Sequence, residues 1–319
     1  MDILNNFKEN LKKEDLKDKT VKNYTSDLNT VLDVFDYSDD FLKTPEASIK
    51  KLEEHYPNIK TLATKINIII MLFQLNYKDN ESLKKFYDEY VEYRNQLRVE
   101  NEEYYKLKIA NPKQLEQAIS NEEIDTIKTV LLSRVRHSIK NRLELNALRD
   151  YVFFCFICDL RSRTDFITSY LVIESPKNEY LDETNYIVLN RCSATITYIQ
   201  ADYKTAKTWG TIPHEIDKDI YKWFIKLYNG YKKLGVLGGF AFYQSDLLHP
   251  MNCANASRLF HEIGKSTINK SITIQSLRLS YASSPEDIEA LERIKKKARK
   301  MGHGMAVHTG VYMKTNMKK

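Results

Sequence analysis

One interval of this 319-residue chain departs from the spacing of apolar residues found elsewhere, and this interval limits the possible folds more than any other feature of the sequence. Over most of the chain, apolar side chains recur at steps of three and four, which predicts amphipathic helices. One interval instead alternates Thr, Ile, Val and Tyr, and it predicts short strands over residues 186–189, 194–202 and 208–213. We therefore expect a mainly α protein with a small antiparallel β-sheet, in the α+β class.

Two domains are expected. The N-terminal helices predicted over residues 20–35, 59–75 and 81–108 end before Asn111-Pro112, because the residue before a proline is pushed out of the helical conformation. This break predicts a helical domain over residues 1–110 and a second domain over residues 111–319. Further helices are expected in the second domain, over residues 147–160, 216–234, 255–264 and 274–283, from Asn121 behind a Ser120-x-x-Glu123 capping box, and after Ser284-Pro285.

Composition excludes several classes of protein. The chain contains nine glycines, and it has neither a G-x-G-x-x-G nor a G-x-x-x-x-G-K-[ST] loop, so we expect no nucleotide cofactor. Its longest apolar stretches, residues 66–73 and 151–160, are too short to span a membrane. The four cysteines are sparse, and Cys155-x-x-Cys158 lies in an apolar run without a second pair at zinc spacing, so we expect no metal and a reducing intracellular compartment.

The charge is unevenly distributed. The whole chain carries +6, residues 1–110 carry −3, and residues 290–319 carry +8. Such a basic segment is either a solvated helix face or a surface that binds phosphates. If it binds DNA, the candidate contacts are Arg293, Lys296 and Lys300, with a local basic face of the first domain formed by Lys8, Lys12, Lys19 and Lys22.

The order of residues near the C-terminus suggests a specific chemistry. Gly302-His303 is followed nine residues later by Tyr312, and Arg278 stands 25 residues before His303 in QSLRLSYASS. In this order the sequence resembles the tyrosine recombinases, also called the phage-integrase family. Its overall look is closest to the integrases of eukaryotic DNA viruses, virophages and related mobile elements. Gln275 departs from the family pattern, in which a histidine stands three residues before the arginine of this motif.

The resemblance also implies a first arginine and a lysine between the two arginines. The first arginine follows a buried helix that contains Arg149-Asp150, and we favour Arg163, with Arg161 as the alternative. The lysine of the family lies on a β-hairpin, and YKTAKTWGTIP provides Lys204, with Lys207 as the alternative.

The resemblance implies a helical core-binding domain and a catalytic domain that form a C-shaped clamp on DNA. Tyr312 would attack a phosphodiester and form a covalent 3′-phosphotyrosine, while Arg163 and Arg278 stabilise the charge on the phosphate. Lys204 would protonate the leaving 5′ oxygen as general acid, and His303 would donate a hydrogen bond to the phosphate. Gln275 can form hydrogen bonds but cannot carry a proton at neutral pH.

The expected function is therefore site-specific recombination or integration of a mobile element or virus by a homotetramer on double-stranded DNA. For a viral protein the expected location is the host nucleus or a virus factory. Two alternatives remain open. One is a type IB topoisomerase, which shares these catalytic residues but is expected to begin with a β-rich segment. The other is a catalytically silent DNA-binding protein on the same fold.

Overall fold

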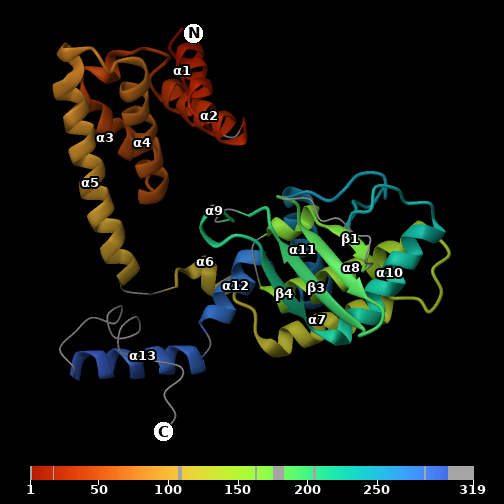
Figure 1. Ribbon diagram of the computed structural model, residues 1–319. Helices are drawn as coiled ribbons and strands as arrows, with labels where there is room; N and C mark the ends of the chain where they lie inside the picture. Colours follow the sequence, from red (N-terminus) through yellow and green to blue (C-terminus); the bar gives the residue numbers. More distant parts are fainter. Residues whose placement is uncertain are drawn as a thin grey trace. The chain divides into compact units, whose positions relative to one another are not determined.

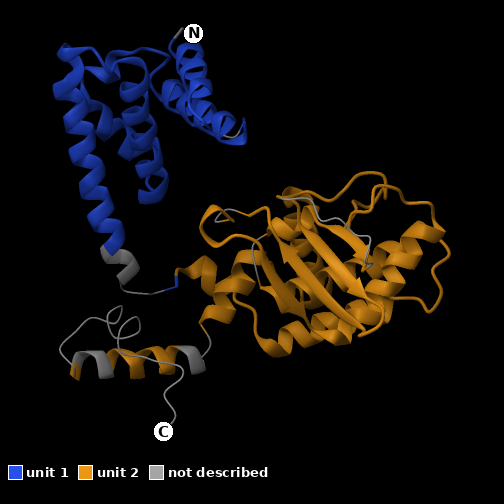
Figure 2. Cartoon of the chain, viewed as in Figure 1, with its two compact units in different colours: residues 1–110 blue, residues 111–319 orange. Residues whose placement is uncertain are grey.

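The computed structural model describes residues 2–16, 18–106, 110–161, 164–174, 183–203, 206–283 and 285–300. The chain forms two compact units, Met1–Ala110 and Asn111–Lys319 (Figure 2). The division falls at the Asn111-Pro112 break predicted from the sequence. Pro112 is the first residue of helix α6 (Pro112–Gln117), and Asn111 caps this helix through a capping box with Gln114.

Every secondary-structure element in the described residues of unit 1 is a helix (Figure 1). Its elements are α1 (Asp2–Lys13), α2 (Asp18–Val34), η1 (Asp40–Leu42), α3 (Pro45–His55), α4 (Ile59–Asn76), η2 (Glu81–Leu83) and α5 (Lys84–Lys106). The helices predicted over residues 20–35, 59–75 and 81–108 correspond to α2, α4 and α5 with η2. Helix α3 was not predicted, since it is short and largely polar.

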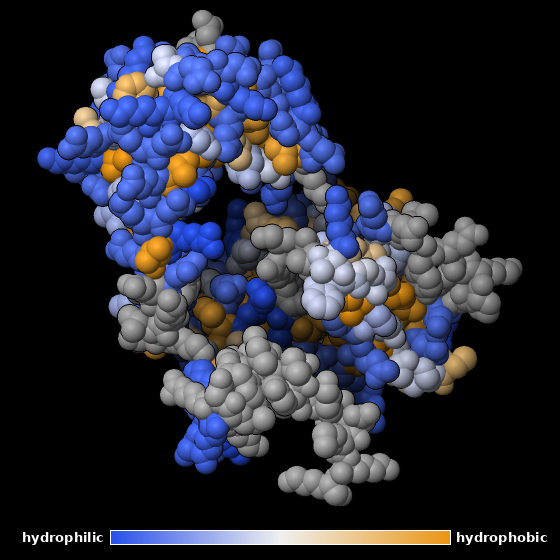
Figure 3. Space-filling model, turned by 60° about the vertical axis from the view of Figure 1, so that its left-hand side comes forward, coloured by the Kyte–Doolittle hydropathy of each residue, from blue (hydrophilic) through white to orange (hydrophobic). Residues whose placement is uncertain are grey.

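The periodic apolar residues of unit 1 form its core. Leu28, Ile69 and Phe73 are almost completely buried, and the buried hydroxyl of Tyr90 donates to the carbonyl oxygen of Phe41 over 2.7 Å. Lys65 is also buried on α4, where its Nζ donates at 2.7 Å to both Asp27 Oδ1 and Thr30 Oγ1 of α2. The surface outside this core is largely hydrophilic (Figure 3).

Unit 2 combines helices with one four-stranded sheet. Its helices are α6 (Pro112–Gln117), α7 (Asn121–Arg134), α8 (Arg142–Leu160), η3 (Thr164–Thr168), α9 (Ala206–Trp209), η4 (Lys218–Ile220), α10 (Tyr221–Lys233), α11 (Cys253–Ile268), α12 (Ile274–Ala282) and α13 (Pro285–Lys300). Its strands are β1 (Tyr170–Ile173), β2 (Tyr186–Asn190), β3 (Thr195–Gln200) and β4 (Ile212–Ile216). The α+β class expected from the sequence is confirmed.

The sheet is mixed rather than wholly antiparallel. Strands β2, β3 and β4 pair antiparallel, whereas β1 pairs parallel with β2. In this parallel pair Tyr170 lies opposite Tyr186 and Ile173 lies opposite Leu189. A parallel pair needs a long connection, and residues 174–185 provide it. Strand β1, Tyr170–Ile173, was not predicted, and its place in the sheet comes from its pairing with β2.

Several predicted boundaries are wrong, including those of α11, which spans Cys253–Ile268 rather than 255–264, and β3, which spans Thr195–Gln200 rather than 194–202. Helix α8 begins at Arg142 rather than Ala147, since Asn141 caps it by accepting a hydrogen bond from the Glu144 amide at 3.0 Å. Residues 208 and 209 belong to α9 and not to a strand. Ile216 ends β4, and the helix predicted from it starts with η4 at Lys218. In each case a cap or a strand pairing determines the boundary, and periodicity does not reveal it.

The core of unit 2 is built around α8, which packs with α7, α10 and β4. Phe153, Phe154 and Phe156 are fully buried, and Cys155 and Cys158 are buried beside them as free thiols. The buried helix expected from the apolar run is therefore confirmed. No helix in the described part of the chain is long and apolar enough to cross a membrane.

Candidate nucleic-acid site

Arg278 and Gln275 lie together on the first turns of α12. Thr273 caps this helix through a capping box with Ser276, which fixes where the helix begins. Residues three apart share a helix face, and Arg278 Nη1 donates to Gln275 Oε1 over 3.1 Å. Gln275 thus accepts from one of the five guanidinium donors of Arg278, and within the described residues the other four have no hydrogen-bond partner.

These two side chains line an open hollow with a volume of about 530 Å³. The hollow is formed by η3, α11 and α12, through Thr164, Asp165, Ser257, Thr273, Ile274, Gln275 and Arg278. Thr164 directly follows Arg163, the favoured first arginine, in the sequence. The fold therefore brings the segment after one predicted arginine to the helix that carries the other. Arg163 itself lies outside the described residues.

Arg161, the alternative first arginine, takes part in packing. It caps α8 in the left-handed conformation, with φ 48°, and its amide donates to the Ile157 carbonyl over 2.9 Å. Its Nε donates to the Cys158 carbonyl over 2.9 Å, and its guanidinium carbon lies 3.8 Å from the centre of the Tyr281 ring. Arg161 thereby joins the end of α8 to α12. The hydrogen bond uses one of the five guanidinium donors, and the ring contact holds the face of the guanidinium against α12.

The lysine hairpin is anchored at its base by Asn185. The Asn185 side-chain oxygen accepts from the amides of Ala201 and Asp202, both at 2.8 Å. Its Nδ2 donates to the carbonyl oxygens of Asp165 and Asp202, both at 2.9 Å. Asn185 is 3% exposed and connects a wall of the hollow at Asp165 to the start of the hairpin at Asp202. The sequence analysis did not identify this residue.

The tip of the hairpin is closed locally. The hydroxyl of Tyr203 donates to the carbonyl of Gly210 over 2.7 Å, and Gly210 has φ 65°, a conformation that favours glycine. Lys207, the alternative lysine, is exposed on α9 within this closed tip. Lys204, the favoured lysine, lies outside the described residues, as do His303 and Tyr312.

Buried tyrosines near the hollow are poorly suited to be nucleophiles. Burial is the main reason that the pKa of Tyr198 is raised, and the nearby carboxylates of Asp165 and Asp202 raise it further. Burial likewise raises the pKa of Tyr231, which lies on α10 and not at the hollow. A nucleophilic tyrosine must lose its proton, so an environment that raises the pKa opposes that role.

His214 lies on β4 beside Tyr198 and was not identified from the sequence. The two rings are stacked with their centres 5.7 Å apart, and His214 Nε2 lies 2.9 Å from Gln200 Oε1. Burial lowers the pKa of His214, which favours the neutral ring. Its contacts make it part of the sheet rather than of the hollow.

Arg149, used above as a sequence marker, has a structural role. It is 2% exposed, and its Nε and Nη2 donate to Asp150 Oδ1 at 2.9 and 2.6 Å. Its Nη1 donates to the Tyr243 carbonyl over 2.8 Å. Burial raises the pKa of Asp150, and the charge of Arg149 partly offsets that effect.

The predicted DNA contacts are exposed where the structure describes them. On α13, Arg293, Lys296 and Lys300 are exposed and recur at steps of three and four, so they share one helix face. Lys8 and Lys12 form an exposed pair on α1, and Lys19 and Lys22 form another on α2.

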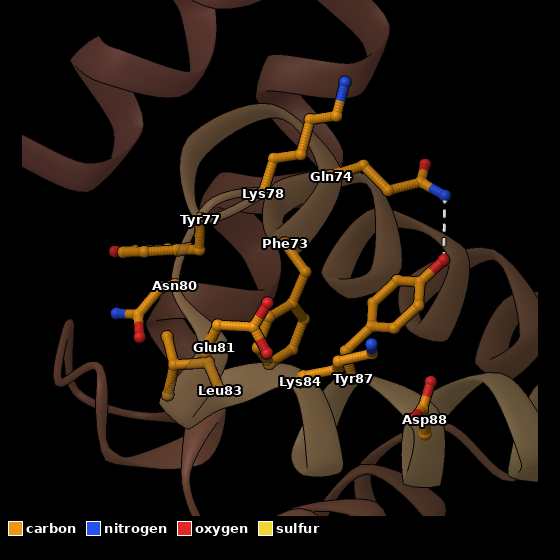
Figure 4. A pocket seen from close by; sticks show the side chains of 10 residues that line it. All are labelled: Phe73, Gln74, Tyr77, Lys78, Asn80, Glu81, Leu83, Lys84, Tyr87 and Asp88. Carbon is orange, nitrogen blue, oxygen red and sulfur yellow. Dashed lines mark hydrogen bonds between the residues drawn. The ribbon is translucent and has the colours of Figure 1, made fainter.

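Unit 1 contains a separate small pocket of about 280 Å³ between the end of α4 and the start of α5 (Figure 4). Phe73 and Leu83 provide its apolar lining, and Gln74 Nε2 donates to the Tyr87 hydroxyl over 3.0 Å at its rim. The rim carries charges of both signs, so it does not favour a polyanion. Within the described ranges no three His, Cys, Asp or Glu side chains are grouped to hold a metal ion.

Comparisons with known proteins identify no relative by sequence. No protein-family model matches the chain, and no curated protein sequence matches it. Among solved structures, the chain is similar to a XerA recombinase with a TM-score of 0.37 and 12% sequence identity. That alignment covers 100% of this chain and 95% of the recombinase chain. Similarity at this level identifies neither a shared activity nor shared site residues.

Proposed function

We propose that this protein is a tyrosine recombinase, which cuts and rejoins double-stranded DNA through a covalent 3′-phosphotyrosine. The observation that carries the proposal is the hollow shared by Thr164, Asp165, Gln275 and Arg278. The order of residues in the sequence had selected the segment around residue 163 and the helix around residue 278 for their catalytic arginines. Two segments more than a hundred residues apart that line one hollow support this selection.

The hollow suits a phosphodiester. Arginine offers permanently charged, forked donors to the non-bridging oxygens, on which negative charge accumulates in the transition state. The bond from Arg278 to Gln275 orients the guanidinium before DNA binds. Gln275 cannot transfer a proton, so proton transfer must come from another group.

In this mechanism the hairpin lysine supplies that proton. The Tyr312 hydroxyl loses its proton to water and its oxygen attacks phosphorus, the bond from phosphorus to the 5′ oxygen breaks, and Lys204 protonates that oxygen. Rejoining reverses each step, with a free 5′-hydroxyl as the attacking group. The phosphotyrosine bond conserves the energy of the broken phosphodiester, so strand exchange between two duplexes requires no nucleotide. His303 donates a hydrogen bond to the phosphate.

The two alternatives predict different results. A type IB topoisomerase is expected to begin with a β-rich segment, whereas every element in the described part of unit 1 is helical. Relaxation of supercoiled plasmid without sequence preference would favour the topoisomerase. A catalytically silent DNA-binding protein would bind DNA and leave every strand intact.

A suicide substrate with a nick next to the cleavage site tests the proposal, because the freed short strand diffuses away and traps the covalent complex. Wild-type protein is expected to form an adduct that survives denaturing electrophoresis, and Tyr312→Phe is expected to form none. Tyr37→Phe, at a tyrosine of unit 1 that is 49% exposed, serves as the control and keeps the adduct. An adduct in Tyr312→Phe, or binding without an adduct in wild-type protein, would contradict the proposal.

A further inference from the structure

A row of lysines runs along the exposed side of α10. Lys222, Lys226 and Lys233 recur at steps of four and seven, so they lie on one face of the helix. Phe224 and Leu227, on the opposite face, are fully buried. Helix α10 contains four lysines and no acidic residue, so no carboxylate within the helix offsets the repulsion between these lysines.

A second basic segment lies directly against this row. Lys226 Nζ donates to the carbonyl oxygen of Arg136 over 2.6 Å, and Lys233 Nζ donates to that of Ile139 over 2.8 Å. The segment from residue 135 to residue 142 contains three Lys or Arg residues and no acidic residue. We call the combined surface the α10 basic face, which consists of Arg136, Lys140, Arg142, Lys222, Lys226 and Lys233.

The α10 basic face is separate from the hollow of Arg278. Gly230 packs so closely on Leu145 that an added Cβ would lie 2.7 Å from its side chain, and Trp223 packs edge-on against Tyr151. Helix α10 therefore runs along α8, with Gly230 on Leu145 near one end and the ring centre of Phe224 5.5 Å from that of Phe156 nearer the other. Arg161 contacts α12 at the C-terminal end of α8, so the Lys233 end of the row is the one farther from that contact. In the view of Figure 1, α10 and α12 lie on opposite sides of unit 2.

We propose that the α10 basic face binds the phosphate backbone of a second DNA duplex while the hollow of Arg278 holds the first. Lys222 and Lys233 are separated by about 16 Å of helix, which spans several phosphates of a duplex. A membrane surface fits less well, because the apolar side of α10 is buried in the core and cannot insert into lipid. The position of the first duplex rests on the proposed function, whereas the basic face itself does not.

The test counts short duplexes of about 12 base pairs bound per protomer, by native mass spectrometry at low salt. Wild-type protein is expected to bind two. The triple variant Lys222→Gln/Lys226→Gln/Lys233→Gln is expected to bind one, and its adduct yield with the suicide substrate stays within about twofold of the wild-type yield. The double variant Arg136→Gln/Lys140→Gln keeps the backbone carbonyls to which Lys226 and Lys233 donate. It is expected to weaken binding of the second duplex as well.

The control variant removes the same charge from scattered exposed lysines of other elements, Lys43, Lys113 and Lys265, each changed to Gln, and it keeps two duplexes. One duplex on wild-type protein, or two on the triple variant, would overturn the inference. If the triple variant loses binding to phosphatidylserine vesicles but keeps two duplexes, the α10 basic face binds a membrane instead. If wild-type protein forms no adduct but the triple variant still loses one duplex, the basic face stands and the proposed function alone fails.

Discussion

Asn185 shows how one buried side chain can set the geometry of a site that it does not line. Its four hydrogen bonds hold the carbonyl of Asp165, at the wall of the hollow, and the backbone of residues 201 and 202, at the base of the lysine hairpin. It uses both lone pairs of its oxygen and both hydrogens of its amide, so no other residue type of similar size can replace it. We interpret it as a positioning residue for the proposed general acid.

Asn185→Ala is therefore expected to slow strand cleavage about 100-fold, because a displacement of the acid by about 1 Å costs this much. Sulfur in place of the bridging 5′ oxygen makes a leaving group that needs no proton. This substrate is expected to restore most of the lost rate in single-turnover cleavage, which a general loss of folding would not allow.

Asn190→Ala is the matched control at the other end of β2. Asn190 also accepts two backbone hydrogen bonds, from Cys192 and Ser193 at 2.8 and 3.0 Å, but it lies at the β2–β3 turn. The Asn190→Ala protein should cleave both the ordinary substrate and the sulfur-containing substrate at the wild-type rate. Equal losses in the two variants, or no rescue by sulfur in Asn185→Ala, would contradict the positioning role.

Arg149 is the buried partner of its ion pair with Asp150, with side chains 3% and 25% exposed, and the contribution of the pair to stability can be measured. Arg149→Met leaves the half-buried Asp150 carboxylate without its partner, so the free energy of unfolding of unit 2 should fall by about 3 kcal/mol. Denaturant unfolding followed by the fluorescence of Trp223 measures this loss. Adding Asp150→Leu to Arg149→Met should recover part of the loss.

Lys270→Met is the control for the buried pair. Lys270 Nζ lies 2.8 Å from Glu123 Oε1, but the two side chains are 26% and 32% exposed. Water screens such a pair, so the expected loss is about 1 kcal/mol or less. Similar losses for Arg149→Met and Lys270→Met would show that burial does not set the energy of the Arg149 pair.

At the residue scale, the sequence selects candidate residues that belong to motifs but not those that act through tertiary contacts. Arg278 and Gln275 were identified, and the structure places both in one hollow. Asn185 could not be identified, because its partners lie 16 to 20 residues away on other segments. The packing role of Arg161 was also hidden, since it depends on Tyr281 of α12.

Among the elements, α8 is the one on which unit 2 depends most. Burial raises the pKa of the Cys155 thiol to about 11 and raises that of Cys158 further. Both thiols should resist iodoacetamide at pH 8 in the folded protein, while the exposed Cys192 and Cys253 react, and all four should react after unfolding. Peptide mapping by mass spectrometry measures the labelling. Equal labelling of Cys155 and Cys192 in the folded protein would contradict the burial of α8.

The same thiols predict a pH dependence of stability. An unfolded thiol ionises near pH 9, whereas burial keeps Cys155 protonated to about pH 11. The folded state therefore binds more protons than the unfolded state between these values, and the free energy of unfolding falls as the pH rises from 9 to 11. Cys155→Ala/Cys158→Ala should flatten this part of the profile, after allowance for the buried tyrosines that titrate at higher pH.

Element types were easier to predict from the sequence than element limits. Helices α2, α4 and α5 follow from apolar periodicity, because packing of one face stabilises them, and α8 follows from a continuous apolar run that is buried on all sides. Strand β1 and the four-residue α9 did not follow, since each is determined by pairing or by hairpin closure with distant residues. The parallel pairing of β1 with β2 is likewise a tertiary property that the alternation of side chains does not encode.

For the whole molecule, the distribution of charge gives the clearest prediction. The chain carries +6 in total, but residues 111–319 carry +9 and residues 1–110 carry −3. Affinity for DNA should therefore depend on salt, and a plot of the logarithm of the association constant against the logarithm of the salt concentration should have a slope of about −0.9 for each phosphate that is neutralised. With six contacts, affinity should fall by about 10³-fold between 50 and 200 mM salt.

Lys296→Gln/Lys300→Gln should reduce that slope by about 2 without changing which DNA sequence is preferred, because phosphate contacts carry no base information. Fluorescence anisotropy over a range of salt concentrations measures both quantities. An affinity that does not change with salt would contradict this use of the charge.

The most direct test of the central claim is the chemical identity of the link between protein and DNA. After cleavage of a suicide substrate, nuclease and protease digestion followed by tandem mass spectrometry should yield one modified peptide, with Tyr312 bonded to a 3′-phosphate and a free 5′-hydroxyl on the released strand. A link at any other residue, a 5′-phosphate bond to the protein, or intact DNA in the presence of bound protein would contradict the account.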